Sequence, residues 1–304
     1  MMFEKFIAAF LGAKLGKLAE FEPLAKHTTL CVGGPARVFV QPSDKESLVK
    51  IIGLVRELGL EFKMLGKGSN LLVSDDMFEG VVIQTDKGLN DTDINGTLVT
   101  VGAGVSDVKL ARCVAKLGLS GLEFLSGIPG TIGGAVFMNA GAYLKEMSDV
   151  LVSVQIIDEK NELVWLQKDD LDLSYRKSIF QQRPDWVIVE AVLQLEHGDK
   201  DEILATIKSR KEKRMMSQPL ELPSAGSTFR NPTGYAAWEL IADAGLRGYI
   251  IGGAKVSEKH TNFVVNAGGA TAQDVANVIA HVQKTVCEKD GLRMHQEVEF
   301  FNWS

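Results

Sequence analysis

The feature that most constrains the fold is a glycine-rich segment in the middle of the chain, residues 121–141. It contains six glycines and one proline among small and apolar residues. A surface loop of this length would be more polar, and a buried strand would contain less glycine. We therefore expect its backbone to lie in close contact with another molecule, and a cofactor diphosphate is the group that suits such a backbone best.

The length and charge of the chain restrict its class and its partners. The 304 residues suffice for two or three packed lobes and for an enzyme interior. Lys and Arg total 33 against 39 Asp and Glu, which gives a formal charge of −6, and the basic residues do not gather into one stripe. We therefore expect no nucleic-acid partner.

The cysteines and the N-terminal segment indicate the compartment. Cys31, Cys113 and Cys287 lie far apart and form no C-x-x-C pair, so we expect no metal site and no disulfide framework. The apolar run between Glu4 and Lys14 is too short to cross a membrane and predicts an amphipathic surface helix. These features favour a cytoplasmic protein that does not bind membranes.

The hydrophobic patterns predict an N-terminal helix followed by three lobes. A strand, an amphipathic helix and further strands around a glycine loop indicate a small βαβ lobe over residues 22–80. Short strands dominate residues 81–199, and a charged helix opens the last region. We expect an α+β chain divided into residues 1–21, 22–80, 81–199 and 200–304.

Two glycine loops, residues 66–70 and 127–134, can turn successive backbone N–H groups toward an anion. Neither follows the G-x-G-x-x-G pattern of a Rossmann unit, and no Walker loop is present. Each loop alone is typical of an ordinary tight turn, because glycine is the default turn residue. The loops together favour phosphate binding.

Five motifs resemble, in order, those of the UDP-N-acetylenolpyruvoylglucosamine reductases, FAD enzymes of bacterial cell-wall precursor synthesis. The motifs lie at residues 65–72, 121–143, 174–180, 223–232 and 296–298. The resemblance spans nearly the whole chain. It implies an FAD-binding fold of the vanillyl-alcohol-oxidase (PCMH) type in two lobes, with a third α+β domain for the substrate. The chain resembles the second form of the family, which lacks an insertion carrying a tyrosine loop.

The resemblance also implies which residues contact non-covalent FAD. The two glycine loops would bind its diphosphate, and a third segment would lie near the flavin. An arginine in the charged helix matches a cofactor contact of the family, although a solvated helix face explains it about equally well. The implied residues are Gly66, Lys67, Gly68, Ser69, Asn70, Leu71, Gly127, Ile128, Pro129, Gly130, Gly133, Gly134, Asn139, Ala140, Gly141 and Arg214.

The implied reaction reduces an enolpyruvyl ether, with NADPH as the hydride-donating co-substrate of the flavin. A hydride must be delivered to the terminal vinyl carbon, and a proton must be delivered to the carbon that bears the carboxylate. Amino-acid side chains cannot donate a hydride, so the flavin must deliver it. Arg176 has a planar cationic fork that suits a carboxylate and a developing enolate. A surface ion pair is the more frequent role of a lone arginine, so the assignment depends on the family motif.

Two further residues carry family roles in proton transfer. Ser227 matches the proton donor of the family. Its neighbours do not form the G-x-S-x-G elbow of hydrolases, so a nucleophilic role is not indicated. A structural role in an ST-turn is the alternative. Glu297 matches the catalytic glutamate of the family, which orients and stabilises the enolate or helps to relay a proton. Its neighbours His295 and Gln296 depart from the sequence expected around that glutamate. Tyr175 and Asn231 adjoin these candidates, and we expect them to contact the UDP-sugar substrate.

Two other functions remain open from the residues. An oxidase or dehydrogenase of the same flavin fold would act on an alcohol or a sugar, and its flavin would be reoxidised rapidly by oxygen. A non-catalytic flavin- or nucleotide-binding module would have no need of Arg176, Ser227 and Glu297.

Overall fold

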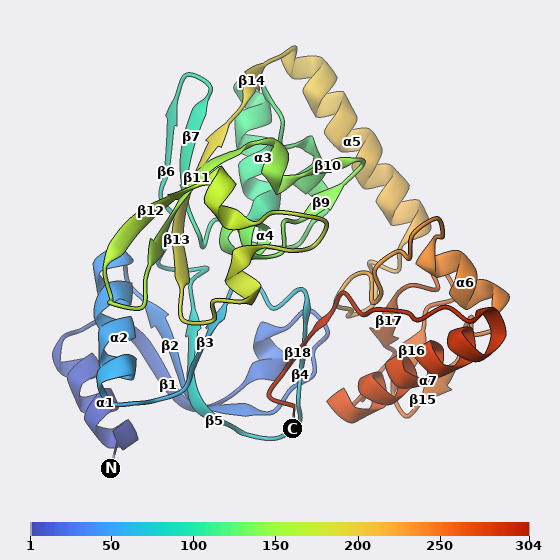
Figure 1. The fold of residues 1–304 in the computed structure, drawn as a ribbon, viewed down its shortest axis with the longest axis horizontal. Coiled ribbons are helices and arrows are strands. Elements are labelled where there is room, and N and C mark those ends of the chain that lie inside the picture. The colour runs from blue at the N-terminus through green and yellow to red at the C-terminus, as the bar shows by residue number, and fades with distance from the viewer. Residues whose placement is uncertain (1, 304) are drawn as a thin grey trace. The chain divides into compact units, whose positions relative to one another are not determined.

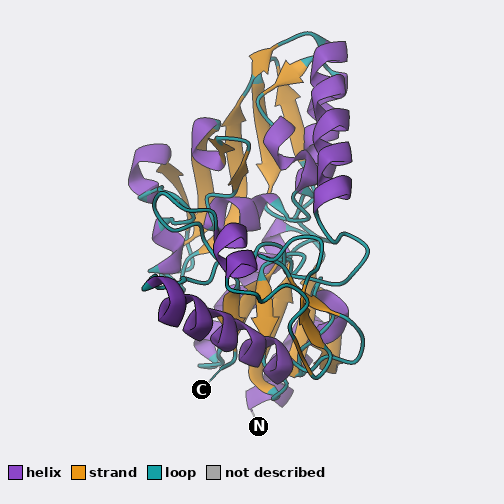
Figure 2. Cartoon of the chain, turned by 90° about the vertical axis from the view of Figure 1, so that its right-hand side faces the viewer, coloured by secondary structure: helices purple, strands orange, loops and turns teal. Residues whose placement is uncertain are grey.

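The computed structural model describes residues 2–303, in which helices and strands are mixed throughout (Figure 2). The chain forms two compact units built from alternating segments. Unit 1 contains Met1–Glu20, Val38–Lys67 and Glu79–Glu212, and unit 2 contains Phe21–Arg37, Gly68–Phe78 and Lys213–Ser304. The mixture of helix and sheet agrees with the predicted α+β class, whereas the four predicted domain ranges remain a prediction.

The first part of unit 1 is a sheet with the strand order β1-β2-β5-β3. Asp44 begins the helix that follows β2, because its carboxylate accepts the backbone N–H of Ser47 at 2.8 Å. The apolar faces of this helix and of the N-terminal helix enter one core with the sheet. The elements are α1 (Met2–Gly12), β1 (Gly16–Pro23), β2 (Pro35–Pro42), α2 (Lys45–Glu57), β3 (Phe62–Leu65) and β5 (Phe78–Gln84).

The second part of unit 1 is an antiparallel sheet with the order β12-β11-β13-β7-β6 (Figure 1). Two helices, α3 and α4, share its core, which is made of alternate apolar residues of the strands. The main elements are β6 (Thr92–Asn95), β7 (Leu98–Gly102), α3 (Asp107–Lys116), α4 (Ile132–Phe137), β11 (Leu151–Ile157), β12 (Leu163–Gln167) and β13 (Val187–Gln194). Short elements complete it: β8 (Leu119–Ser120), η2 (Glu123–Gly127), β9 (Gly141–Ala142), β10 (Lys145–Glu146), η3 (Met147–Asp149), η4 (Lys168–Leu171), η5 (Ile179–Gln181) and β14 (Glu196–His197).

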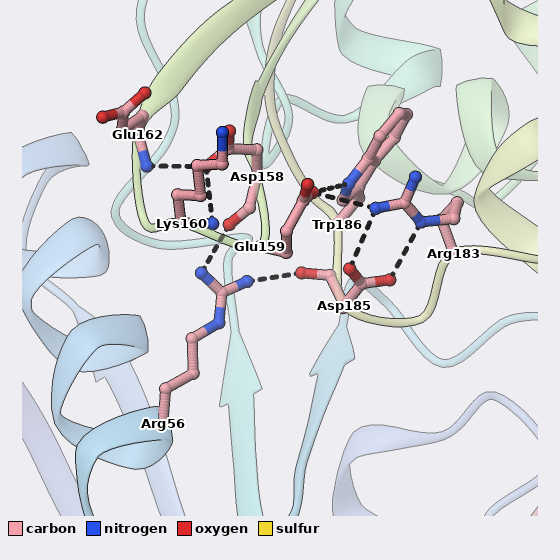
Figure 3. Close-up of polar contacts among 8 residues, drawn as sticks. All are labelled: Arg56, Asp158, Glu159, Lys160, Glu162, Arg183, Asp185 and Trp186. Carbon is pink, nitrogen blue, oxygen red and sulfur yellow. Dashed lines mark hydrogen bonds and ion pairs between the residues drawn. The ribbon is translucent and has the colours of Figure 1, made fainter.

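A cation joins these two parts of unit 1. Arg56, at the end of α2, donates to the backbone carbonyls of Asp158 and Asp185 (Figure 3). Beside it, Arg183 forms ion pairs with Asp185 and Glu159 at 3.1 and 2.8 Å. Carbonyl oxygens at the ends of strands lack ladder partners, so a guanidinium that binds two of them fixes both strand ends against the helix.

Unit 2 contains a small antiparallel sheet, β15-β16-β17, packed against the longest of its helices. A separate parallel pair joins β4 to β18, with Glu299 opposite Leu71. Helix α5 is continuous across the residues at which the two units divide. The elements are η1 (Leu24–His27), β4 (Leu71–Val73), α5 (Lys200–Ser217), α6 (Ala237–Asp243), β15 (Ile250–Ile251), β16 (Ala254–Val256), β17 (Val264–Asn266), α7 (Ala272–Asp290) and β18 (Glu299–Phe301).

The start of α7 explains why a segment from early in the chain belongs to unit 2. The carboxylate of Asp75 accepts the backbone N–H groups of Ala272 and Gln273 at 3.0 and 3.1 Å. Thr271 and Asp274 add a capping box at the same end. These acceptors satisfy the first N–H groups of the helix and attach residues 68–78 to it. Within the described residues, no helix has the length and apolar character needed to cross a bilayer.

Candidate functional site

The first glycine loop contacts the second one inside unit 1. A Cβ atom at Gly66 would lie 2.5 Å from Oγ1 of Thr131, so only glycine permits this approach. Lys67 Nζ donates to Oγ of Ser106 at 2.7 Å, which holds the ammonium at the start of α3. The structure thus brings the predicted Gly66 and Lys67 together with the predicted loop 127–134.

The second glycine loop pairs with the segment that precedes α3. The N–H of Gly133 donates to the carbonyl of Ala103 at 2.8 Å, and the N–H of Asp107 donates to the carbonyl of Gly130 at 3.2 Å. A Cβ atom at Gly130 would lie 2.3 Å from Oδ2 of Asp107. Gly134 is exposed in the first turn of α4, where its N–H donates to Oγ1 of Thr131 at 3.4 Å. Packing inside the protein therefore accounts for Gly130 and Gly133, whereas the N–H of Gly134 binds the Thr131 side chain that caps α4.

Asp107 is a buried carboxyl group that the sequence analysis did not identify. Its side chain is fully buried, and neither oxygen has a hydrogen-bond partner among residues 2–303. Burial raises the pKa of Asp107 to about 8, and the charge of Lys67 opposes this shift. The available signal was the Gly102-Ala103-Gly104 turn just before it, which resembles an incomplete dinucleotide motif.

The two loops fit the diphosphate of FAD. Residues 66–71 and 127–134 contain one charged side chain, the cation Lys67. The neighbouring Asp107, with its pKa near 8, is mostly neutral at pH 7 and adds little negative charge. A cation and a neutralised carboxyl, beside loops without an anionic side chain, are conditions under which a dianionic group binds favourably.

The predicted Arg176 lies against the predicted flavin segment. Its φ of 56° places it at the left-handed position of a turn closed between Ser174 and Lys177. Nη2 donates to the carbonyl of Gly141 at 2.7 Å, and Nη1 to that of Asn139 at 3.5 Å. Two carbonyl oxygens thus orient the guanidinium of Arg176. The ring of Tyr175 lies 4.8 Å from the guanidinium and is half exposed.

Asn139 has its amide engaged inside the protein. The residue is fully buried and has a φ of 41°. Nδ2 donates to Oε1 of Glu146 and to the carbonyl of Ser174, both at 2.9 Å, and Oδ1 accepts the N–H of Ser148 at 2.9 Å. Both amide hydrogens are therefore used, one to bind Glu146 and the other to link the flavin segment to the turn that bears Arg176.

The structure brings Ser227 and Glu297 onto paired segments of unit 2. Phe229 forms an antiparallel bridge with Gln296, and the N–H of Glu297 donates to the carbonyl of Thr228 at 2.8 Å. Ser227 and Glu297 are both half-buried. The predicted cofactor residue Asn70 belongs to the same group, because its Nδ2 donates to the carbonyl of Glu297 at 3.1 Å.

Other predicted residues lie apart from these contacts. Asn231 is exposed, and its Oδ1 accepts the N–H of Ala237 at 3.0 Å, which caps α6. Arg214 is half-buried near the end of α5. Gly68 has a φ of 59° and packs on the carbonyl of His27, where a Cβ atom would lie 2.3 Å away.

Comparison with known proteins identifies both regions of the chain. The model of the FAD binding domain matches residues 36–167, and that of the UDP-N-acetylenolpyruvoylglucosamine reductase C-terminal domain matches residues 218–301. A UDP-N-acetylenolpyruvoylglucosamine reductase of Bacillus subtilis (strain 168) is 48% identical over 97% of this chain and 98% of its own. One of Anoxybacillus flavithermus is 47% identical over the same shares.

A solved structure extends the comparison to the fold. The crystal structure of UDP-N-acetylenolpyruvylglucosamine reductase from Thermus caldophilus has a TM-score of 0.80 and 35% identity, and the match covers 94% of this chain and 98% of that one. With the match to the FAD binding domain, this confirms the predicted FAD-binding fold of mixed helix and sheet.

Proposed function

The chain belongs to the UDP-N-acetylenolpyruvoylglucosamine reductase family, and we propose that it reduces the enolpyruvyl ether of that UDP-sugar to UDP-N-acetylmuramate, with NADPH as hydride donor. The observation that carries this proposal is the correspondence with reductases over nearly the entire chain. Bound FAD supplies the hydride transfer that amino-acid side chains cannot supply. We place the reaction in the cytoplasm, where the free Cys31, Cys113 and Cys287 would stay reduced.

The cofactor would be held by the glycine loops and by the segment next to Arg176. Lys67 would bind the diphosphate, supported by the bond from its Nζ to Oγ of Ser106, which pairs with Thr131 of the second loop. The remaining contacts would come from Gly68–Leu71, residues 127–134, residues 139–141 and Arg214. The substrate would contact Tyr175 and Asn231, which offer a phenol and an amide for hydrogen bonds.

Arg176 would bind the carboxylate of the enolpyruvyl group. Hydride addition at the terminal vinyl carbon leaves negative charge beside that carboxylate, and a fixed cation stabilises this state more than the ground state. The bond from its Nη2 to the Gly141 carbonyl orients the guanidinium before the substrate binds. This supports its assignment as the electrophilic residue.

Ser227 would donate a proton to the carbon that bears the carboxylate. One hydride and one proton then complete the reduction of the double bond, and NADPH is oxidised to NADP⁺. A neutral hydroxyl introduces no further charge beside an anionic intermediate. Glu297 would orient the substrate or return a proton to Ser227, supported by the backbone contact between Thr228 and Glu297.

Stopped-flow measurement of the two half-reactions tests the proposal. Ser227→Ala should let NADPH bleach the flavin at the wild-type rate and should nearly abolish reoxidation by the enolpyruvyl substrate. Ser217→Ala, at the exposed end of α5, is the matched control and should leave both rates unchanged. Rapid reoxidation of wild-type protein by oxygen alone would indicate an oxidase, and the lack of either hydride step would indicate a binding module.

A further inference from the structure

The segment that carries Ser227 lies between two neighbouring stretches of unit 2. On one side, the N–H of Glu297 donates to the carbonyl of Thr228 at 2.8 Å. On the other side, the N–H of Thr228 donates to the carbonyl of Asn262 at 2.8 Å, and the N–H of Val264 to Thr228 Oγ1 at 3.1 Å. Thr228, the residue after Ser227, is therefore held on both flanks.

Asn262 adds a second attachment through its side chain. Its Oδ1 accepts the N–H of Phe229 and its Nδ2 donates to the carbonyl of the same residue, both at 2.9 Å. Asn262 and Phe229 are 4% and 1% exposed, so water does not compete for these bonds. One amide thus satisfies both backbone polar groups of Phe229, and its loss would leave two buried groups without partners.

On the N-terminal side of Ser227, the next attachment is at Ser224, whose carbonyl accepts a hydrogen bond from Oγ1 of Thr29 at 2.7 Å. Gly226 has a φ of 79°, and no atom lies within 4 Å of where its side chain would stand. Ser227 is half-buried and lies in the sequence between this glycine and the hydrogen-bonded residues Thr228 and Phe229. The attachments nearest to its hydroxyl are therefore those of Thr228 and Phe229 on the C-terminal side.

We infer that Asn262 is a positioning residue, which fixes the backbone at Thr228 and Phe229 so that the Ser227 hydroxyl is held for proton transfer to the substrate. The inference rests on the proposed function of Ser227. A proton donor acts over hydrogen-bond distance, and a displacement of about 1 Å can cost about 100-fold in rate. Asn262 acts through Ser227 and is not itself a catalytic residue.

The test compares Asn262→Ala with Asn266→Ala in stopped-flow experiments on the FAD-loaded protein. Asn266 is a control from the same unit, because its amide also bonds backbone groups, those of Leu30 and Gly268, outside the Ser227 segment. Asn262→Ala should slow flavin reoxidation by the enolpyruvyl substrate about 100-fold and leave reduction by NADPH unchanged. Asn266→Ala should leave both half-reactions unchanged. Equal slowing of both half-reactions in Asn262→Ala would overturn the inference.

A double variant separates positioning from an independent effect. Added to Ser227→Ala, Asn262→Ala should cause no further loss of reoxidation rate, because the group that it positions is already absent. Additive losses would overturn the inference. Wild-type reoxidation in Ser227→Ala alone would instead overturn the proposed role of Ser227. If Asn262→Ala fails to retain FAD, Asn262→Asp keeps the acceptor for the Phe229 N–H and should slow the same half-reaction selectively; unchanged reoxidation in Asn262→Asp would overturn the inference.

Discussion

The backbone N–H of Glu297 donates to the carbonyl oxygen of Thr228 over 2.8 Å, so a residue near the C-terminus is held one position away from Ser227. The amide of Asn70 then binds the carbonyl of Glu297, and the N–H of Glu299 donates to the carbonyl of Asn70 at 2.9 Å. Segments about 230 residues apart in the sequence, at Asn70 and Glu297, thus form one hydrogen-bonded group in unit 2.

This arrangement predicts a selective effect of Glu297→Gln. The amide is isosteric but cannot take up a proton or return one to Ser227, so reoxidation by the substrate should slow by about 100-fold or more. Reduction by NADPH should stay at the wild-type rate in the same stopped-flow traces. Glu258→Gln, a change at an exposed glutamate of the same unit, is the control. Wild-type reoxidation in Glu297→Gln would refute its proposed role.

Arg176→Lys tests whether the guanidinium geometry matters beyond its charge. Lysine keeps the cation but lacks the planar fork that binds both the Gly141 and the Asn139 carbonyls. We expect reoxidation by the substrate to fall by about 100- to 1,000-fold. The same substitution at Arg183, which forms exposed ion pairs, should leave that rate unchanged. An equally active Arg176→Lys protein would show that charge alone suffices.

Much of this arrangement could be predicted from the sequence where local pattern determines it. The helix after Asp44 and the strand at residues 62–65 follow from a cap and from hydrophobic period. The glycine loops are predicted from their glycine content alone, and the structure gives the reason at Gly66 and Gly130, where a Cβ atom would lie too close to Thr131 and Asp107. Both predictions need only neighbours in the sequence or the residue type itself.

The remaining features depend on contacts between distant segments. No local pattern shows that Asp75 caps α7 across nearly 200 residues, or that Asn262 binds the backbone of Phe229. The same holds for Asp107. An aspartate at the start of a helix is common, and only the fold shows that this one is buried with no hydrogen-bond partner among the residues that the structure describes. Sequence reasoning therefore identified the loops but missed the carboxyl beneath them.

The contact between Gly130 and Asp107 predicts a coupled effect on stability. In Gly130→Ala the new methyl group would meet Oδ2 of Asp107, and overpacking of this kind costs about 1–3 kcal/mol. Asp107→Ala removes the obstructing carboxyl. The double variant should therefore lose less unfolding free energy than the sum of the losses in the two single variants. Urea denaturation of the three variants measures this coupling. Strict additivity would contradict the steric explanation.

Asp107 also predicts how stability depends on pH. Burial raises its folded-state pKa to about 8 from an ordinary value of 3.8, so between these values the folded protein retains a proton that the unfolded chain has released. The contribution of the neutral carboxyl to stability is complete below about pH 4 and is lost as the pH rises through about 8. Asp107→Asn cannot ionise, so its stability relative to wild type should rise between pH 5 and pH 8, by at most about 1.4 kcal/mol per pH unit. Urea denaturation of both proteins at several pH values measures the difference, and parallel stability curves would show that the folded-state pKa of Asp107 is not raised.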